Sequence, residues 1–399
     1  MGSMFTERST FVITVRLVLA LLVLHAIAIA RQDRARVTVT NPAPFARGLE
    51  TVSIPWNALH NVAPDLNPEA IVVTDNTTRR AVVAQVIDLD LDGKPREIVF
   101  QTELKPKERR TFTVGRGAPA QQENRVMVKF MLPRADMAWE NDKVAYRIYG
   151  GAEAGDVLNG IDMISKRVAG FRLEKWYEED HRPGALRISY HEDHGEGADF
   201  FTVGRSLGAG GAGIWKDGKL HQAGLFSHYR IVANGPIRSV FEVYYPTWNV
   251  DSTEYIEVRR FTFDAGLFLN RIEATFIGKD PSASLEIACG LVKRAGTMLT
   301  KGEKRGTVSL WGPTNSDPAN GNQGTAVVLE STVGSRVVEN SAHALIIAKA
   351  SVSRPFAWYS GGGWSKNAEF PNKEAWELYV KERADKLAAP VVVVISLGK

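Results

Sequence analysis

Alternation of apolar and polar residues with a period of two predicts an all-β protein. In the run Phe268–Phe276, Ile272 and Phe276 share one face, whereas Arg271 and Glu273 share the other. Such alternation is typical of strands that bury one face. Similar runs occur at Glu254–Asp264, Val126–Leu132, Val144–Tyr149, Ile237–Tyr245, Thr325–Leu329, Leu345–Ala348 and Val391–Ile395.

The run Glu254–Asp264 changes parity along its length. Ile256 and Val258 fall on one face, but Phe261 and Phe263 fall on the other. If apolar residues mark the buried face, the strand has to shift its register between these pairs. The sequence therefore predicts a β-bulge near residues 259–260.

One helix is expected near the C-terminus. Asn372 is a suitable N-cap, Glu374 suits the positive first turn, and Arg383 and Lys386 suit the negative end. The residues at helical spacing are expected to pack onto the sheets; they are Trp376, Tyr379 and Val380.

The composition divides the chain into three parts. Residues 1–30 resemble a signal peptide, and Gly, Pro, Ala and Gln replace the strand pattern over residues 115–124. The strand candidates before this segment suffice for a small β-sandwich, at residues 31–120. The longer strands of residues 121–399 predict a large two-sheet sandwich that carries the site.

The N-terminal segment has the layout of a secretory signal. Arg8 and Arg16 precede the apolar run Leu17–Ala30, and residues 28–30 read Ala-Ile-Ala. The alternative is an uncleaved membrane anchor, because residues 11–30 are nearly long enough to span a bilayer. The signal reading predicts a periplasmic or secreted protein without stable membrane insertion after cleavage.

The net charge indicates which partners to expect, and the cysteine content indicates whether a disulfide can form. The formal net charge is +4 and the sequence pI is ≈ 9.0, which favours anionic partners. No basic stripe interleaved with aromatic residues is present, so nucleic acid is not expected. The single cysteine, Cys289, has no intramolecular partner and is expected to be buried and inert.

The segment Asn141–Tyr149 is the first candidate for binding chemistry. As a strand it would direct Asn141, Lys143, Arg147 and Tyr149 to one face. Such a face suits a substrate carboxylate, because an arginine binds it through two parallel hydrogen bonds. An ordinary solvated strand face is the alternative. Just upstream, Trp139 is a candidate for stacking on a sugar ring.

The segment Tyr190–Asp199 gathers two histidines, four carboxylates and a tyrosine within ten residues. His191 and His194 are candidates for a general base or for metal ligands, and the carboxylates are compatible with Ca²⁺ or with no metal. Glycines at 195 and 197 mark a loop, where functional groups concentrate. The alternative is a polar turn whose side chains cap their own backbone.

Other candidate positions lie further along the chain. The glycine-rich run 204–211 lacks the Lys-Ser/Thr of a phosphate loop, so nucleotide binding is rejected, and Arg205 beside it is a second candidate for carboxylate binding. His228 and Arg230 share one strand face. The run 358–366 places Tyr359 and Trp364 around glycines, which suits sugar binding or core packing equally.

Together, Trp139 to Gly150, Tyr190 to Gly211 and Trp358 to Ser365 resemble the exported bacterial family called domain of unknown function forty-eight sixty-one. Members are often encoded beside pectin- and uronate-degrading enzymes. The resemblance implies a carbohydrate-active role and a galactose-mutarotase-like supersandwich, with no established catalytic residue to transfer. Lys143 stands where many relatives have arginine.

A lyase that cleaves uronic-acid polysaccharide or oligosaccharide by β-elimination is the leading hypothesis. Elimination needs a neutralised carboxylate, a base and an acid. The candidates for neutralising the carboxylate are Asn141, Arg147 and Arg205. The candidates for the base are His191 and His194, and those for the acid are Tyr190 and Tyr359. The alternatives are a glycoside hydrolase using Asp142, Asp193 or Glu196, and a glycan-binding protein without turnover.

These assignments require residues from separate segments to meet. We expect the side chains of Asn141, Arg147, His191, His194 and Arg205 to converge on one cleft.

The export hypothesis has a direct test. If residues 1–30 are a signal peptide, exported protein should begin at or near Arg31. N-terminal sequencing of protein recovered outside the cytoplasm measures this, and exported material that begins near residue 1 would contradict it.

Overall fold

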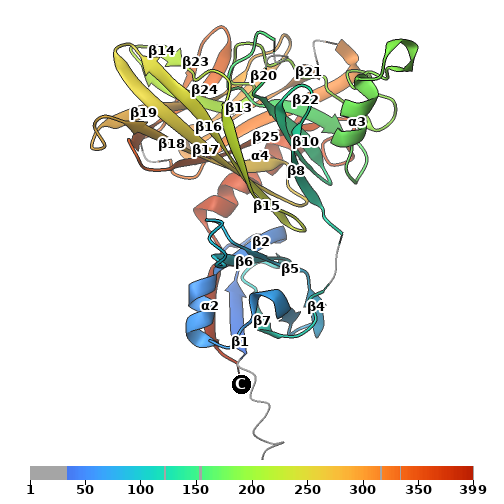
Figure 1. Cartoon of the computed structure of the whole chain (residues 1–399), viewed down its shortest axis with the longest axis vertical. Coiled ribbons are helices and arrows are strands. Elements are labelled where there is room, and N and C mark those ends of the chain that lie inside the picture. Colours follow the sequence, from blue (N-terminus) through green and yellow to red (C-terminus); the bar gives the residue numbers. More distant parts are fainter. Residues whose placement is uncertain (1–33, 121–122, 152–154, 315–316, 333, 399) are drawn as a thin grey trace, which may run out of the picture.

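The computed structural model describes residues 34–398 except 121–122, 152–154, 315–316 and 333. Within these residues the fold is mostly β, as expected, and the strands form two packed bodies (Figure 1). The proposed signal peptide lies outside the described residues. No helix in the described ranges is long and apolar enough to cross a membrane.

The smaller body is a sandwich of a five-stranded and a three-stranded sheet. Its core consists mainly of valine, isoleucine, leucine and phenylalanine side chains. The helix α2 (Trp56–Val62) buries Leu59 against it. The five-stranded sheet runs β26 (Val392–Leu397), β1 (Ala35–Thr40), β7 (Arg109–Arg116), β3 (Ile71–Asp75) and β4 (Arg80–Val82). The three-stranded sheet runs β2 (Arg47–Pro55), β6 (Glu97–Leu104) and β5 (Ala84–Ile87).

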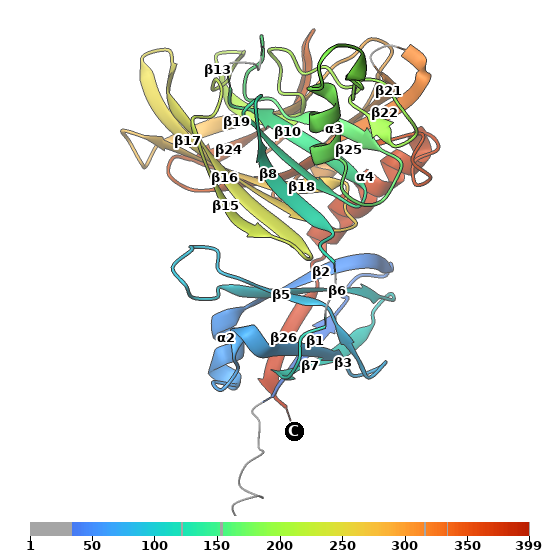
Figure 2. The same cartoon turned by 45° about the vertical axis from the view of Figure 1, so that its right-hand side comes forward.

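The C-terminal strand β26 belongs to this smaller body. It pairs antiparallel with β1, with Val37 opposite Ile395. Figure 2 shows the chain descending from the larger body to make this pairing. The large sandwich expected over residues 121–399 therefore does not include the last strand. Nothing in the alternation of Val391–Ile395 indicates which sheet receives it.

The larger body contains three sheets in the described part of the chain, with one extensive shared core. The eight-stranded sheet runs β15 (His228–Asn234), β16 (Arg238–Val250), β17 (Thr253–Asp264), β18 (Leu269–Gly278), β25 (Phe356–Trp364), β22 (Asp317–Leu329), β21 (Thr307–Thr314) and β20 (Met298–Gly302). One five-stranded sheet runs β14 (Lys219–His221), β13 (Ala209–Lys216), β19 (Ser284–Val292), β24 (His343–Ser351) and β23 (Arg336–Glu339). The other runs β12 (Gly197–Ala198), β11 (Asp162–Lys166), β10 (Val144–Tyr149), β9 (Asp136–Asn141) and β8 (Val126–Met131).

Two helices cover these sheets. The helix α4 (Lys373–Ala388) begins where expected, and the Asn372 side chain accepts a hydrogen bond from the Ala375 amide. Its Trp376 and Val380 are buried, which confirms that they pack onto the sheets. The shorter helix α3 (Leu173–Asp180) packs on the sheet that contains β9 and β10.

The expected bulge in β17 is absent from the pairing of this strand with β18, which stays in register from Tyr255 to Thr262. The buried face carries Glu257 and Arg259 beside the two phenylalanines. These two charged side chains form an ion pair, and Arg259 Nη1 donates to the Asn159 carbonyl at 3.0 Å. The prediction was wrong because a paired charge occupies positions at which we expected apolar residues.

The pairing of β26 with β1 predicts the effect of a C-terminal truncation. Removing residues 391–399 should expose β1 as an edge strand and lower the melting temperature of the smaller body by at least about 5 °C, since 1 kcal/mol corresponds to about 4–8 °C in a domain of this size. Removing Lys399 alone is the control. Equal melting temperatures by calorimetry would contradict the assignment.

Candidate functional site

The site is built on the middle of β10, where Arg147 faces α3. Val144, Tyr146 and Ile148 point into the main core, as the alternation predicts. The expected strand is shorter than predicted, because Asn141 ends β9 and Lys143 lies in the bend between β9 and β10. Arg147 lies directly opposite Asp162 in β11 and opposite Ala138 in β9. The small Ala138 side chain leaves room for the guanidinium group above the sheet.

Arg147 is buried and binds one side chain from β11 and two from the segment Tyr190–Asp199. Its Nε donates to Asp162 Oδ2 at 2.8 Å, its Nη1 to the Tyr190 hydroxyl at 2.8 Å, and its Nη2 to Asp199 Oδ2 at 2.7 Å. Tyr149 also donates to Asp162 Oδ2, at 2.6 Å. The arginine therefore holds both ends of the segment Tyr190–Asp199 against the sheet.

Burial and crowding of carboxylates set the protonation of this cluster. Burial, with Asp162 adding to it and Arg147 opposing it, raises the pKa of Asp199 to about 8. Burial likewise raises the pKa of Asp136, which accepts a hydrogen bond from Tyr177 at 2.8 Å. Although burial alone would lower the pKa of Arg147, Asp162 and other acidic neighbours hold it well above its ordinary value. The arginine is charged, and Asp199 retains a proton near neutral pH.

His191 lies at the surface of this buried cluster. Its Nδ1 is 3.1 Å from the Asp199 carbonyl oxygen and 3.5 Å from Asp199 Oδ2, and its side chain is 51% exposed. A carbonyl oxygen only accepts hydrogen bonds, so Nδ1 carries the proton in the neutral ring. The lone pair is then on Nε2, which points away from Asp199. This arrangement suits a general base.

The loop itself is held by its aspartate and glycines. Asp193 Oδ1 accepts hydrogen bonds from the amides of Gly195 and Gly197, at 2.9 and 3.0 Å. Gly197 has φ +122°, and a side chain there would collide with the Ser165 carbonyl. The other Asp193 oxygen pairs with Arg167. Asp193 therefore caps its own backbone, as the alternative interpretation of this segment expects, and its second oxygen ties the loop to Arg167.

A cavity of ≈ 270 Å³ lies between this loop and α3. His194 and Tyr190 line it, together with Lys175 and Glu196, whose charged groups are 2.8 Å apart. Although burial opposes it, Lys175 and Arg172 lower the pKa of Glu196, so this carboxylate stays ionised. Among the described residues, no group of three or more His, Cys, Asp or Glu side chains could hold a metal ion.

The predicted convergence is only partly present in the structure. Arg147, Tyr190 and His191 meet through Asp199, and His194 lies in the adjoining cavity. Asn141 is instead buried and donates to the carbonyls of Asp264 and Leu267, at 2.8 and 2.7 Å. Arg205 forms an exposed ion pair with Asp156 at 2.8 Å. These contacts place neither side chain in the cluster around Arg147.

Two of the aromatic residues that were candidates for sugar binding have structural roles instead. Trp139 is in the core and donates to Asn270 Oδ1 at 2.6 Å. Trp364 is 1% exposed, lies beneath the Arg167 guanidinium at 5.0 Å, and donates to the Asn320 carbonyl. Neither indole face is open to a sugar ring.

The remaining binding candidates are scattered over the larger body. Lys143 pairs with Glu369, Arg230 pairs with Glu242 at 2.8 Å, and the exposed His228 lies on β15 beside Ser227. Tyr359 is stacked under Arg383 in a different cavity. These four residues do not join the cluster around Arg147.

Sequence reasoning missed two of the carboxylates around Arg147, Asp136 and Asp162, whereas Asp199 lies in a segment already singled out. Asp136 and Asp162 each begin a buried strand, and Asp199 ends the histidine loop. An acidic residue within an otherwise apolar strand is the signal that could have found them, because burial of an unpaired carboxylate is costly.

The family described as domain of unknown function (DUF4861) matches residues 39–393. A protein from Formosa agariphila named "Uncharacterized protein P7" is 28% identical over 388 residues, which cover 92% of this chain and 95% of that protein.

Two solved structures from Enterococcus faecalis, a glycosyl hydrolase family 38 protein and an α-mannosidase, match 92% of the chain at 10% and 9% identity, with TM-scores of 0.46 and 0.47. The chain spans about half the length of these two structures, at 48% and 46%.

The raised pKa of Asp199 predicts how pH affects stability. The folded state keeps this proton up to about pH 8, whereas an unfolded aspartate loses it near its ordinary value of about 3.9. The contribution of Asp199 to stability is therefore fully present below about pH 4 and is lost as pH rises to about 8, by at most about 1.4 kcal/mol per pH unit. Asp199→Asn, which cannot ionise, should lack this dependence.

Denaturant unfolding of both proteins at several pH values measures the difference. If the free energies of unfolding of wild type and Asp199→Asn differ by the same amount from pH 4 to pH 8, the raised pKa of Asp199 is contradicted.

Proposed function

Because the chain belongs to the family described as domain of unknown function (DUF4861), its activity has to be argued from the site, and we propose that it is a carbohydrate-active lyase. The substrate class is a polysaccharide or oligosaccharide that contains uronic acid, and the reaction is β-elimination. The observation that carries this proposal is the contact of His191 Nδ1 with the Asp199 carbonyl oxygen at 3.1 Å, made by a side chain that is half exposed above the buried Arg147 cluster.

His191 is the base of the proposed reaction. Its Nε2 removes the proton from the carbon next to the substrate carboxylate. The electron pair forms a carbon–carbon double bond with the neighbouring carbon, whose bond to the glycosidic oxygen breaks. His194, which lines the adjoining cavity, supplies a proton to the departing oxygen.

Asp199 and Arg147 act as positioning residues. The Asp199 backbone holds His191, and the Asp199 side chain is held by Arg147 at 2.7 Å. The hydroxyl of Tyr190 also binds Arg147, so its role is to fix the loop beside the base. A residue that fixes a base in one tautomer raises the fraction of the enzyme that is ready to react.

The substrate carboxylate would be neutralised by cations that contact the same loop. Arg167 pairs with Asp193, while Arg172 and Lys175 pair with Glu196. A uronate group can compete with these carboxylates because it offers the same two oxygens. The positive charge of the whole chain also favours the approach of an acidic glycan.

Elimination is favoured over hydrolysis by the state of the carboxylates. Hydrolysis with two carboxyl groups needs one that is protonated and reaches the substrate. Glu196 stays ionised beside Lys175 and Arg172, and Asp199, which keeps its proton, is only 1% exposed. A single imidazole base fits elimination better.

A variant of the base tests the proposal. His191→Ala should reduce the increase in absorbance at the unsaturated-uronate band by about 10²–10⁴-fold on a panel of polyuronates. His60→Ala, which alters an exposed histidine on α2 of the smaller body, is the matched control and should keep full activity.

The other outcomes identify the alternatives. New reducing ends without the absorbance change would indicate a glycoside hydrolase. Binding of the glycans without either product would indicate a binding protein, and equal activity of the His191 variant and wild type would refute the role of the base.

A further inference from the structure

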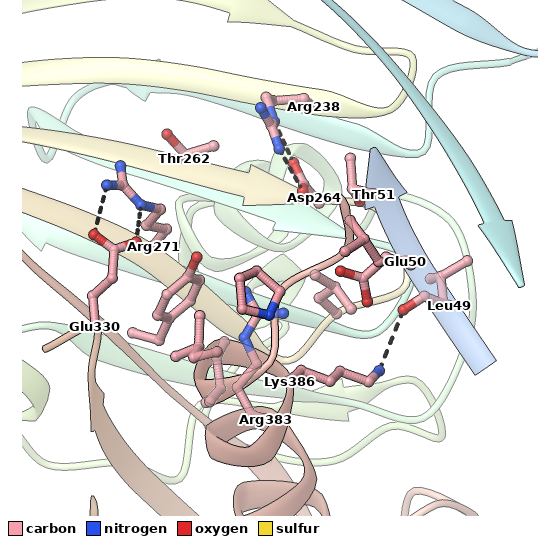
Figure 3. A pocket seen from close by; sticks show the side chains of 16 residues that line it. Leu49, Glu50, Thr51, Arg238, Thr262, Asp264, Arg271, Glu330, Arg383 and Lys386 are labelled. Carbon is pink, nitrogen blue, oxygen red and sulfur yellow. Dashed lines mark hydrogen bonds and ion pairs between the residues drawn. The ribbon is translucent and has the colours of Figure 1, made fainter. Parts of the chain in front are cut away.

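A second cavity, of ≈ 380 Å³, lies at the junction of the two bodies (Figure 3). It is lined by residues of β2 from the smaller body, by β17 and β18 of the large sheet, and by the end of α4. Cavities between domains are frequent ligand sites, and this volume lies within the range of small-molecule sites. It shares no lining residue with the cavity beside His194.

Two of the arginines that line this cavity already have partners. Arg238 binds Asp264 at 2.7 Å and Glu97 at 3.1 Å. Arg271 binds Glu330 at 2.9 Å. Figure 3 shows the Arg238–Asp264 and Arg271–Glu330 pairs. They account for the acidic residues of the large sheet in the lining. The remaining carboxylate among the lining residues is Glu50 of β2, which pairs with Arg47 at 3.1 Å.

Arg383 and Lys386 lie one turn apart on α4, and neither forms an ion pair with a carboxylate in the described part of the chain, although Glu50 of β2 acts on the charge of Lys386. The Arg383 guanidinium stacks on the Tyr359 ring at 4.0 Å, and its Nε is buried without a hydrogen-bond acceptor. Lys386 reaches across to β2, where its Nζ donates to the Leu49 carbonyl at 3.4 Å (Figure 3). Adjacent like charges that are partly removed from water are unfavourable unless an anion joins them.

The end of a helix does not explain this arrangement. The negative end of α4 attracts cations, and Lys386 lies in its last turn. However, the carbonyl of Ala389 just beyond the helix already accepts from Arg47. The helix end accounts for positive charge near the cavity, but not for a buried donor that has no acceptor.

Apolar groups line the rest of the cavity beside these cations. Leu267, Leu269 and Leu387 supply aliphatic surface, and Thr262 lies opposite α4. A ligand that fits needs one anionic group with two acceptor oxygens and a compact body with both hydroxyl and C–H faces. A sugar acid has these features, whereas an inorganic anion would leave the aliphatic walls without contacts.

We propose that the junction cavity binds a sugar acid of one or two rings, with its carboxylate between Arg383 and Lys386. The Tyr359 ring holds the guanidinium in place for this contact, and the C–H face of the sugar packs on the leucines. Because Leu49 to Thr51 come from the smaller body, the ligand would also tie the two bodies together. This site is separate from the proposed catalytic loop and does not rest on the proposed function.

Calorimetric titration of the full chain tests the site, with D-glucuronate as the probe and D-glucose as its neutral counterpart. We expect glucuronate to bind wild type and glucose not to bind. Arg383→Gln and Lys386→Gln should each weaken glucuronate binding at least about tenfold, as expected for loss of a charge-assisted hydrogen bond. Lys381→Gln, an exposed position on the same helix that pairs with Asp385, is the matched control and should bind as wild type does.

The His191→Ala variant separates the two sites, because it should bind glucuronate unchanged at the junction. Thermal melting confirms that each variant is folded, and Lys386→Gln decides the matter if Arg383→Gln does not fold. The proposal fails if wild type does not bind glucuronate, or if both glutamine variants bind it as tightly as wild type. It also fails if His191→Ala loses binding while Arg383→Gln retains it.

Discussion

The buried charge of Arg147 is the constraint around which the candidate site is organised. A guanidinium removed from water has to find acceptors, and it finds them in Asp162, Tyr190 and Asp199. Two of these acceptors bracket the histidine loop, so satisfying the arginine also fixes the loop. The position of His191 thus follows from an electrostatic requirement in the sheet beneath it.

The same requirement recurs elsewhere in the larger body. Lys166 is fully buried and pairs with Glu140, while Arg259 pairs with Glu257 inside the main core. Breaking such a pair leaves an uncompensated buried charge, which is strongly destabilising. These pairs restrict how the sheets can pack, because each cation reaches acceptors on a neighbouring segment, such as the Asn159 carbonyl for Arg259.

The sequence predicted the parts of the fold that depend on local pattern. The alternation in Val144–Tyr149 and the cap at Asn372 are local, and both are confirmed. The pairing of β26 with β1 joins residues from opposite ends of the chain, and no local pattern specifies it. The bulge in β17 was wrongly predicted because alternation treats every charge as exposed, whereas Glu257 and Arg259 neutralise each other in the core.

The candidate site shows the same division between local and long-range information. Polar residues in a dense motif look alike in a sequence whether they serve a ligand or their own chain. The side chains of Asn141 and Trp139 donate their hydrogen bonds to other groups of the protein, and Arg147 donates to three such acceptors. His191 differs because its side chain is half exposed and, among the described contacts, only its Nδ1 is held, by the Asp199 carbonyl. A half-satisfied, half-exposed titratable group on a rigid support is therefore a better sign of chemistry than the density of polar residues around it.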